Sequence, residues 1–195
     1  MKVFLAGIFG GIAMFIWTSI AHLALPLGEA GIGEIPNESA VLSALQSNIG
    51  GQTGLYIFPG LGVGKNATRQ EENEAMKQIA AKAGSGPSGI LMYHPTRAFT
   101  FGKWMGIEFG TELLEAILVV FLLAQTRIAS FAGRVGFVFV AGILAAMATN
   151  VSLWNWYGFP SVYIGSYMLI QVVGFLCVGI VAALMLRKTS LRTAP

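Results

Sequence analysis

Long apolar stretches alternate with polar segments along this chain. Four stretches are long enough to cross a bilayer, which takes about 20 residues for ~30 Å of hydrocarbon. They cover residues 3–25, 104–126, 135–153 and 161–186. Backbone N–H and C=O groups find no partner in hydrocarbon, so each stretch is expected to form a helix. The pattern predicts an all-α membrane protein, a four-transmembrane-helix bundle with a small α+β extracytoplasmic insertion between the first and second helices.

The composition agrees with a membrane protein. The chain is 55% hydrophobic and only 11% charged, whereas a soluble domain carries about 25% charged residues. Its net charge of +3 comes from basic residues that flank the apolar stretches, so we expect no nucleic-acid partner. Cys177 is the only cysteine, which rules out a disulfide within the chain and suits a small packing residue.

Basic residues near the ends of the stretches predict the orientation, because such residues favour the cytoplasmic side. Lys2 precedes the first stretch, and Arg127 and Arg134 lie between the second and third. Arg187, Lys188 and Arg192 follow the fourth. Both termini are therefore expected in the cytoplasm, with residues 187–195 as a cytoplasmic tail. Residues 26–102 then lie outside, in the periplasmic or extracellular space, and we expect an integral protein of a bacterial inner membrane.

The insertion is patterned rather than featureless. It predicts a helix over 38–49, a strand over 54–58, a helix over 69–83 and a strand over 89–94. Asn37 stands where it could cap the first helix, and Thr68 with Glu71 has the spacing of a capping box. Gly84 is expected to end the second helix. So small a sheet needs another surface to pack on.

Three glutamates interrupt the second apolar stretch. Glu108, Glu112 and Glu115 fall within an arc of about 60° on one helix face, at 100° per residue. A carboxylate inside a bilayer is costly and usually marks a working site. Mutual repulsion and burial predict that at least one of the three is protonated at neutral pH unless a cation is bound.

Polar residues of the other stretches fall in the same half of the membrane, the outer one. We therefore predict an outer-leaflet cavity lined by Glu108, Thr111, Glu112, Glu115, His22, Asn150 and Gln171. The inner halves are apolar, which argues against a channel or a proton relay. Part of the outer polarity is an interfacial belt that anchors helices at head-group level. The expected anchors are Trp17, Trp104, Trp154, Trp156, Tyr163 and Tyr167.

The cofactor is left open by the sequence. His22 and His94, the only histidines, could join the three glutamates as ligands of Zn²⁺, Mn²⁺ or Fe²⁺. No Glu-x-x-His pair of the di-iron type supports this metal site. Local hydrogen bonding of each histidine is the more common situation, and a haem held by both histidines is less expected still.

Three classes of function fit these observations. The favoured one is a non-catalytic accessory or assembly subunit of a membrane complex, whose glutamates pair with a partner's basic residue. The second is an outward-facing protein that binds a metal or small ligand. The third is a membrane enzyme that uses a glutamate as acid or base with His94. Besides the lipid bilayer, the expected partner is another membrane protein or a second copy of the chain.

Overall fold

The computed structural model describes residues 1–64 and 66–187. The chain divides into two compact units: Met1–Ile32 with Thr100–Pro195, and Gly33–Phe99. Most of the predicted cytoplasmic tail, including Lys188 and Arg192, lies outside the described residues.

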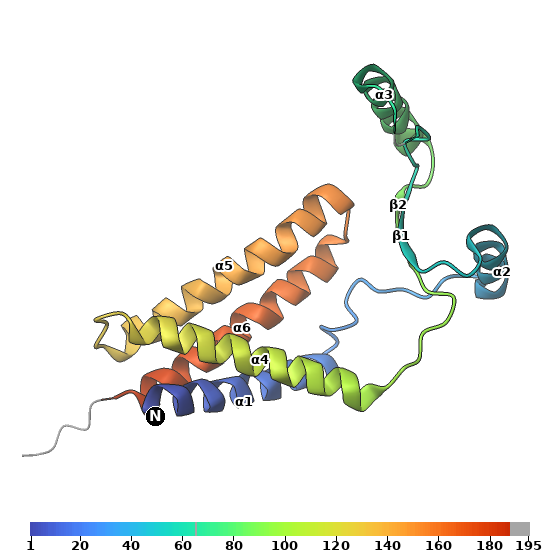
Figure 1. Ribbon diagram of the computed structural model, residues 1–195. Helices are drawn as coiled ribbons and strands as arrows, with labels where there is room; N and C mark the ends of the chain where they lie inside the picture. The colour runs from blue at the N-terminus through green and yellow to red at the C-terminus, as the bar shows by residue number, and fades with distance from the viewer. Residues whose placement is uncertain (65, 188–195) are drawn as a thin grey trace, which may run out of the picture. The chain divides into compact units, whose positions relative to one another are not determined.

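Four long helices make up the first unit: α1 (Lys2–Leu23), α4 (Phe101–Ala124), α5 (Phe131–Tyr157) and α6 (Ser161–Met185) (Figure 1). Helices α1, α5 and α6 are long and apolar enough to cross a membrane. These three helices indicate an integral membrane protein. Helix α4 is equally long but carries three glutamates, so its role as a fourth span stays a prediction.

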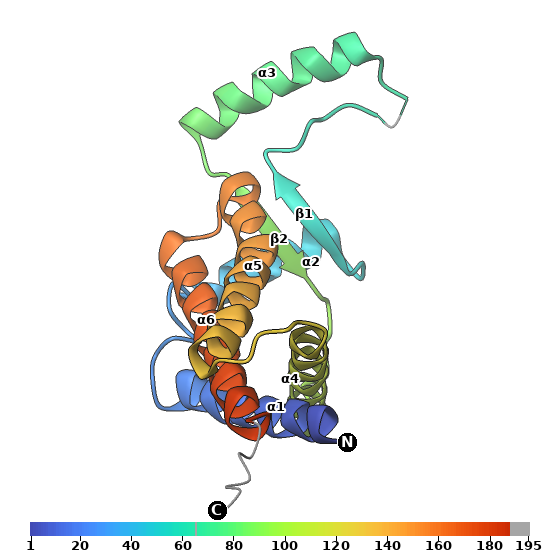
Figure 2. The ribbon, with the colours of Figure 1, turned by 90° about the vertical axis from the view of Figure 1, so that its left-hand side faces the viewer.

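Helix α1 packs on both α4 and α6, and α6 packs on α5 (Figure 2). Helices α1 and α4 run antiparallel, since Gly7 lies against Ile117 and Gly11 against Leu113. A Cβ on Gly11 would come within 2.8 Å of the Leu113 Cα. Glycines on α1 therefore let the two backbones approach closely, as is common between membrane helices. Helix α4 makes only limited contacts with α5 and α6.

The long helices differ from the predicted bounds by a few residues, and α5 shows the largest extension, with a cap at each end. Helix α5 begins at Phe131, not at residue 135, because Ser130 caps it by accepting a hydrogen bond from the Gly133 N–H (3.1 Å). It continues to Tyr157 rather than ending at residue 153. Gly158, the next residue, takes a left-handed conformation with φ 69° and ends the helix. Hydropathy marks the apolar section of a helix, whereas caps decide its ends.

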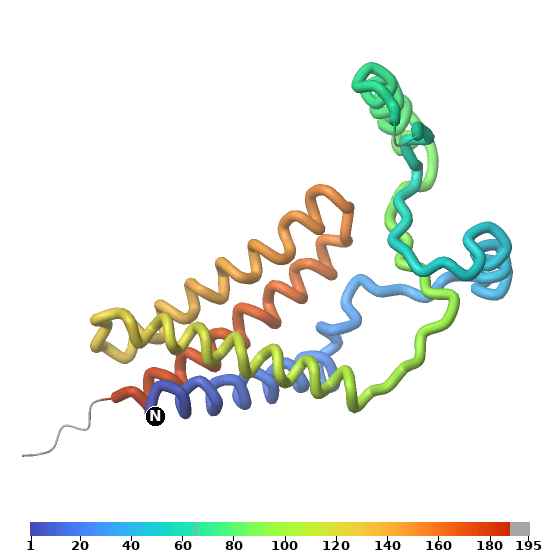
Figure 3. Tube along the Cα trace, viewed as in Figure 1, coloured from blue at the N-terminus to red at the C-terminus, as the bar shows by residue number. Residues whose placement is uncertain are grey.

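The second unit contains α2 (Glu38–Ile49), β1 (Gly54–Phe58), α3 (Arg69–Ser85) and β2 (Gly89–Tyr93). Strands β1 and β2 pair antiparallel, from Gly54 opposite Tyr93 to Phe58 opposite Gly89. The trace in Figure 3 follows β1 through α3 into β2. Helix α2 and strand β1 have the predicted bounds, α3 is longer than predicted, and β2 ends one residue earlier.

Three capping predictions meet different outcomes. The capping box is confirmed: the Thr68 N–H donates to Glu71 Oε2 (2.7 Å) and the Glu71 N–H donates to Thr68 Oγ1 (3.3 Å). Asn37 does precede α2, but it is left-handed (φ 55°) and its side chain makes no capping bond. Gly84 lies inside α3 rather than ending it, since the helix continues through Ser85, whose hydroxyl donates to the Ala81 carbonyl (2.9 Å).

Candidate functional site

The glutamates occupy the middle of α4 but differ in exposure. Glu112 is only 4% exposed. Glu108 is exposed and Glu115 is half-buried. Their spacings of four and three residues place the side chains next to one another along one flank of the helix. We call Glu108, Glu112 and Glu115 the glutamate stripe.

Glu112 is buried because α1 approaches α4 closely at this point. A Cβ on Gly11 would lie 3.3 Å from the Glu112 carbonyl oxygen, and the Thr18 side chain of α1 lies beside the Glu112 carboxyl. The Oε2 atom of Glu112 is buried and has no hydrogen-bond partner among the described residues. A buried polar atom without a partner is costly, since it has lost water and gained nothing in return.

His22 completes this side of the site at the end of α1. Its Nδ1 lies 2.9 Å from the Thr18 carbonyl oxygen. A carbonyl can only accept, so Nδ1 carries the proton and donates. The ring meets Tyr167 edge-on at a centroid distance of 6.1 Å, and Gly28 packs so closely against it that no Cβ would fit. His22 also lies within electrostatic range of Glu112.

Tyrosines of α6 form the far side of this group. The rings of Tyr163 and Tyr167 lie 4.5 Å apart, and Glu108 is within electrostatic range of Tyr167. Both tyrosines were expected only as interfacial anchors. The structure thus gathers the glutamate stripe, His22 and this tyrosine pair from three different helices. This contact could not be predicted from the sequence, because only the packing of α6 on α1 brings Tyr167 to His22.

Asn150 and Gln171 behave differently from the other predicted cavity residues. The Asn150 amide donates to Gln171 Oε1 (2.8 Å) and to the Ala146 carbonyl (2.9 Å). Thr149 joins the same network, since its hydroxyl accepts from Asn150 (2.8 Å). These residues tie α5 to α6. Thr111 is satisfied on its own helix, by donating to the Ile107 carbonyl (2.9 Å).

One cavity lined by all seven predicted residues therefore stays a prediction. The contacts of these side chains form two sets, one around the glutamate stripe and one between α5 and α6. The sequence placed both sets in the same half of the helices. It could not tell which polar residues satisfy each other.

Two of the predicted tryptophan anchors also join helices. The Trp17 indole donates to the Ile170 carbonyl of α6 (2.9 Å), and the Trp154 indole donates to the Ser161 hydroxyl (3.0 Å). Trp156 is 79% exposed and Trp104 is 37% exposed. Exposure of this kind suits an interfacial position, where one end of the indole is wet and the other apolar.

The predicted metal set is not assembled in the described part of the chain. There, no group of three His, Cys, Asp or Glu side chains is placed to hold an ion. His94 belongs to the second unit, where it is exposed after β2.

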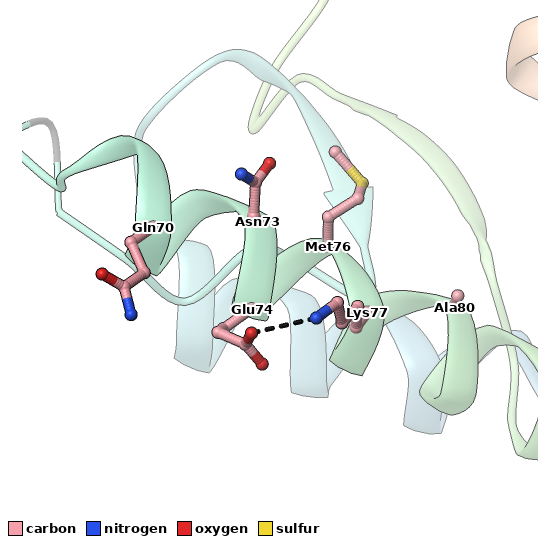
Figure 4. A pocket seen from close by; sticks show the side chains of 6 residues that line it. All are labelled: Gln70, Asn73, Glu74, Met76, Lys77 and Ala80. Carbon is pink, nitrogen blue, oxygen red and sulfur yellow. Dashed lines mark hydrogen bonds and ion pairs between the residues drawn. The ribbon is translucent and has the colours of Figure 1, made fainter.

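A shallow hollow lies on α3 of the second unit (Figure 4). Its lining residues are Gln70, Asn73, Glu74, Met76, Lys77 and Ala80. Glu74 and Lys77 form an exposed ion pair of 3.0 Å across it. All six side chains come from one helix, so a ligand would be held from one side only. Binding sites are normally concave and lined by several elements, and we do not regard this hollow as one.

The arrangement around Glu112 can hold a positive charge. It offers carboxylates at three levels of exposure, an oriented imidazole and two tyrosine hydroxyls.

No protein-family model, curated protein or solved structure matches the chain.

Proposed function

We propose that this protein is a non-catalytic accessory or assembly subunit of a membrane complex, and that α4 is its fourth membrane-spanning helix. Helix α4 runs antiparallel along α1, from Ile117 against Gly7 to Phe109 against Phe15 (ring centroids 5.0 Å apart). A helix that packs lengthwise on a membrane-spanning helix shares its depth. Basic residues near the helix ends favour cytoplasmic termini, with residues 33–99 outside.

The observation that carries this proposal is the exposed flank of α4. Glu108 is exposed and Glu115 is half-buried there, on a helix whose Leu118 and Leu122 are 52% and 55% exposed. Exposed leucines pack well against lipid or against another helix. A carboxylate is costly in lipid, because hydrocarbon offers it neither water nor a countercharge. A partner helix with a basic side chain would satisfy both requirements.

The two alternatives have less support. A metal site lacks a third protein ligand among the described residues of the first unit. An enzyme with Glu112 and His94 as acid and base would need groups from both units. The accessory role needs only the exposed flank of α4, which lies within one unit.

The test is to isolate the tagged full-length protein from native membranes in mild detergent. We expect a stoichiometric membrane protein to accompany it, and the level of that protein to fall when the chain is deleted. The double variant Glu108→Gln/Glu115→Gln should lose the partner. The matched variant Glu34→Gln/Glu38→Gln changes two exposed glutamates of the second unit and should keep it. Recovery of the chain alone from freshly solubilised membranes would overturn the proposal.

A further inference from the structure

We propose that the α4 flank with Glu108 and Glu115 binds a membrane-spanning helix of a different protein, which carries a basic side chain within the bilayer. This inference rests on the proposed function and adds the chemistry of the partner. It follows from the spacing of the two glutamates, from the uncompensated charge around them and from the positions of the chain's own basic residues.

The flank has the form of a helix-packing surface. Glu108 and Glu115 are seven residues apart, which places them about 10.5 Å apart along the axis and nearly in line. Thr111 lies between them and makes no demand on a partner, because its hydroxyl donates to the Ile107 carbonyl. Leu122, which is 55% exposed, continues the same line toward the other end of α4. A partner helix would meet two carboxylates followed by an exposed leucine.

The negative charge of this region is not balanced by the chain itself. Glu112 is 96% buried, its Oε2 lacks a partner among the described residues, and it lies within electrostatic range of Glu108 and Glu115. Among the described residues, His22 is the one basic side chain within electrostatic range of Glu112. Three acidic groups therefore face one imidazole. A cation supplied from outside would lower the energy of all three carboxyls, since each feels the charge of the others.

The long helices of a second copy bring no cation to Glu115. Their Lys and Arg residues lie in the first turns: Lys2 in α1, Lys103 in α4 and Arg134 in α5. In a parallel pair of α4 helices, Lys103 would lie about 7.5 Å along the axis from Glu108 but about 18 Å from Glu115. Arg134 already donates to the Ile128 carbonyl (3.0 Å). Because Glu115 is beyond the reach of a second copy, we assign the flank to a helix of another protein.

The experiment uses the full-length protein in vesicles of neutral phosphatidylcholine. Two synthetic Leu/Ala helices are compared, identical except for one Arg or one Gln at the centre, and binding is followed by energy transfer from a labelled peptide. We expect the Arg peptide to bind about tenfold more tightly than the Gln peptide, which corresponds to about 1.4 kcal/mol. Glu108→Gln/Glu115→Gln should abolish this preference, and Glu34→Gln/Glu38→Gln should preserve it.

Equal binding of the two peptides, or a preference that survives in Glu108→Gln/Glu115→Gln, would overturn the inference. Circular dichroism checks that the variants are folded, and the single variant Glu115→Gln gives the same readout if the double variant is not. Self-association that depends on Glu115 would assign the flank to a second copy and would also overturn it. A native partner without a basic residue in its membrane helices would leave the accessory role standing and refute this inference alone.

Discussion

Two regions of the first unit bury a polar side chain to the same extent and treat it in opposite ways. Asn150 on α5 is 6% exposed and Glu112 on α4 is 4% exposed. The Asn150 amide donates to Gln171 and to the Ala146 carbonyl, whereas Glu112 Oε2 has no partner among the described residues. Burial by itself therefore does not show whether a polar residue is structural or functional. The state of its hydrogen bonds does.

The difference follows from how the helices pair. Helices α5 and α6 pack along much of their length, and Asn150 of one helix meets Gln171 of the other. Helix α4 rests mainly on α1, where Thr18 and His22 are the groups near Glu112. The amide pair joins two helices, while Glu112 keeps one carboxyl oxygen without a partner among the described residues.

The largest effect is expected from adding a methyl group where the helices touch. Gly142→Ala would place a Cβ in the space of the Phe175 side chain, and Gly11→Ala would place one 2.8 Å from the Leu113 Cα. Overpacking of this kind typically costs about 1–3 kcal/mol, and we expect about 2–3 kcal/mol for each. Thermal unfolding in detergent measures it. Gly136→Ala, which meets nothing within 4 Å, is the control and should be neutral or slightly stabilising.

If Gly11→Ala were as harmless as Gly136→Ala, α1 and α4 would not be in close contact. The burial of Glu112 depends on that contact, so this result would remove the contrast with Asn150. A large loss for both Gly11→Ala and Gly142→Ala would instead show that the two helix pairs are equally tight and differ only in their polar groups.

The next effect should be a gain in stability. Glu112→Met replaces a buried carboxyl by an unbranched apolar side chain of similar length. An unsatisfied buried polar group costs about 1–3 kcal/mol, so we expect the free energy of unfolding of the isolated protein to rise by about 1–2 kcal/mol. The same unfolding assay measures it, with Glu115→Met as a half-buried control that gains less. A loss of stability would mean that the contact of the Glu112 carboxyl with the Thr18 side chain outweighs the cost of its buried Oε2 atom.

The matching substitution on α5, Asn150→Leu, should lower the stability of the protein. Asn150→Leu removes the closer donor of Gln171 Oε1, at 2.8 Å, and leaves it the Thr149 hydroxyl at 3.3 Å. Hydrogen bonds between membrane helices average about 0.6 kcal/mol and reach about 1.7 kcal/mol, so we expect a loss of about 1 kcal/mol. A double-mutant cycle with Gln171→Leu isolates the pairwise part. Coupling near zero would show that the pair does not hold α5 to α6.

The sequence predicted the glutamate stripe because helical periodicity is a local property. Glu108, Glu112 and Glu115 must share one face of any helix that contains them. The capping box at Thr68 and Glu71 was predictable for the same reason, since its two hydrogen bonds span only three residues. The left-handed conformation of Asn37 was not, because an asparagine beside a helix start more often caps it through its side chain.

The hydrogen bonds between polar residues of different helices could not be predicted from the local sequence. Asn150 and Gln171 are 21 residues apart, and their meeting depends on the register of α5 on α6, which close contacts such as Gly142 on Phe175 decide. Tyr167 reaches His22 by the packing of α6 on α1. The sequence could group polar residues by depth, but the helix contacts decide which of them satisfy each other.

The smallest effect concerns a carboxylate that has its partners, Glu71 at the start of α3. Hydrogen bonds from the Thr68 backbone and then from the Thr68 side chain lower the pKa of Glu71 below its ordinary value of 4.5. A folded-state pKa below the unfolded one means that the cap stabilises α3 above pH 4.5 and is lost as the pH falls through the folded pKa. Carbon-13 NMR of the Glu71 carboxyl should show this low midpoint.

Thr68→Val removes the side-chain donor and keeps the backbone donor, so the pKa of Glu71 should rise only part of the way to 4.5. Thr53→Val, a matched change ahead of β1, should leave the midpoint unmoved. An unshifted midpoint in Thr68→Val would mean that the backbone alone supplies the cap. Either way Glu71 has two donors from one residue three positions away, whereas Glu112 has the Thr18 side chain beside it and an Oε2 atom without a partner among the described residues. That difference is why we assign the proposed partner to the glutamate stripe and not to the capping box.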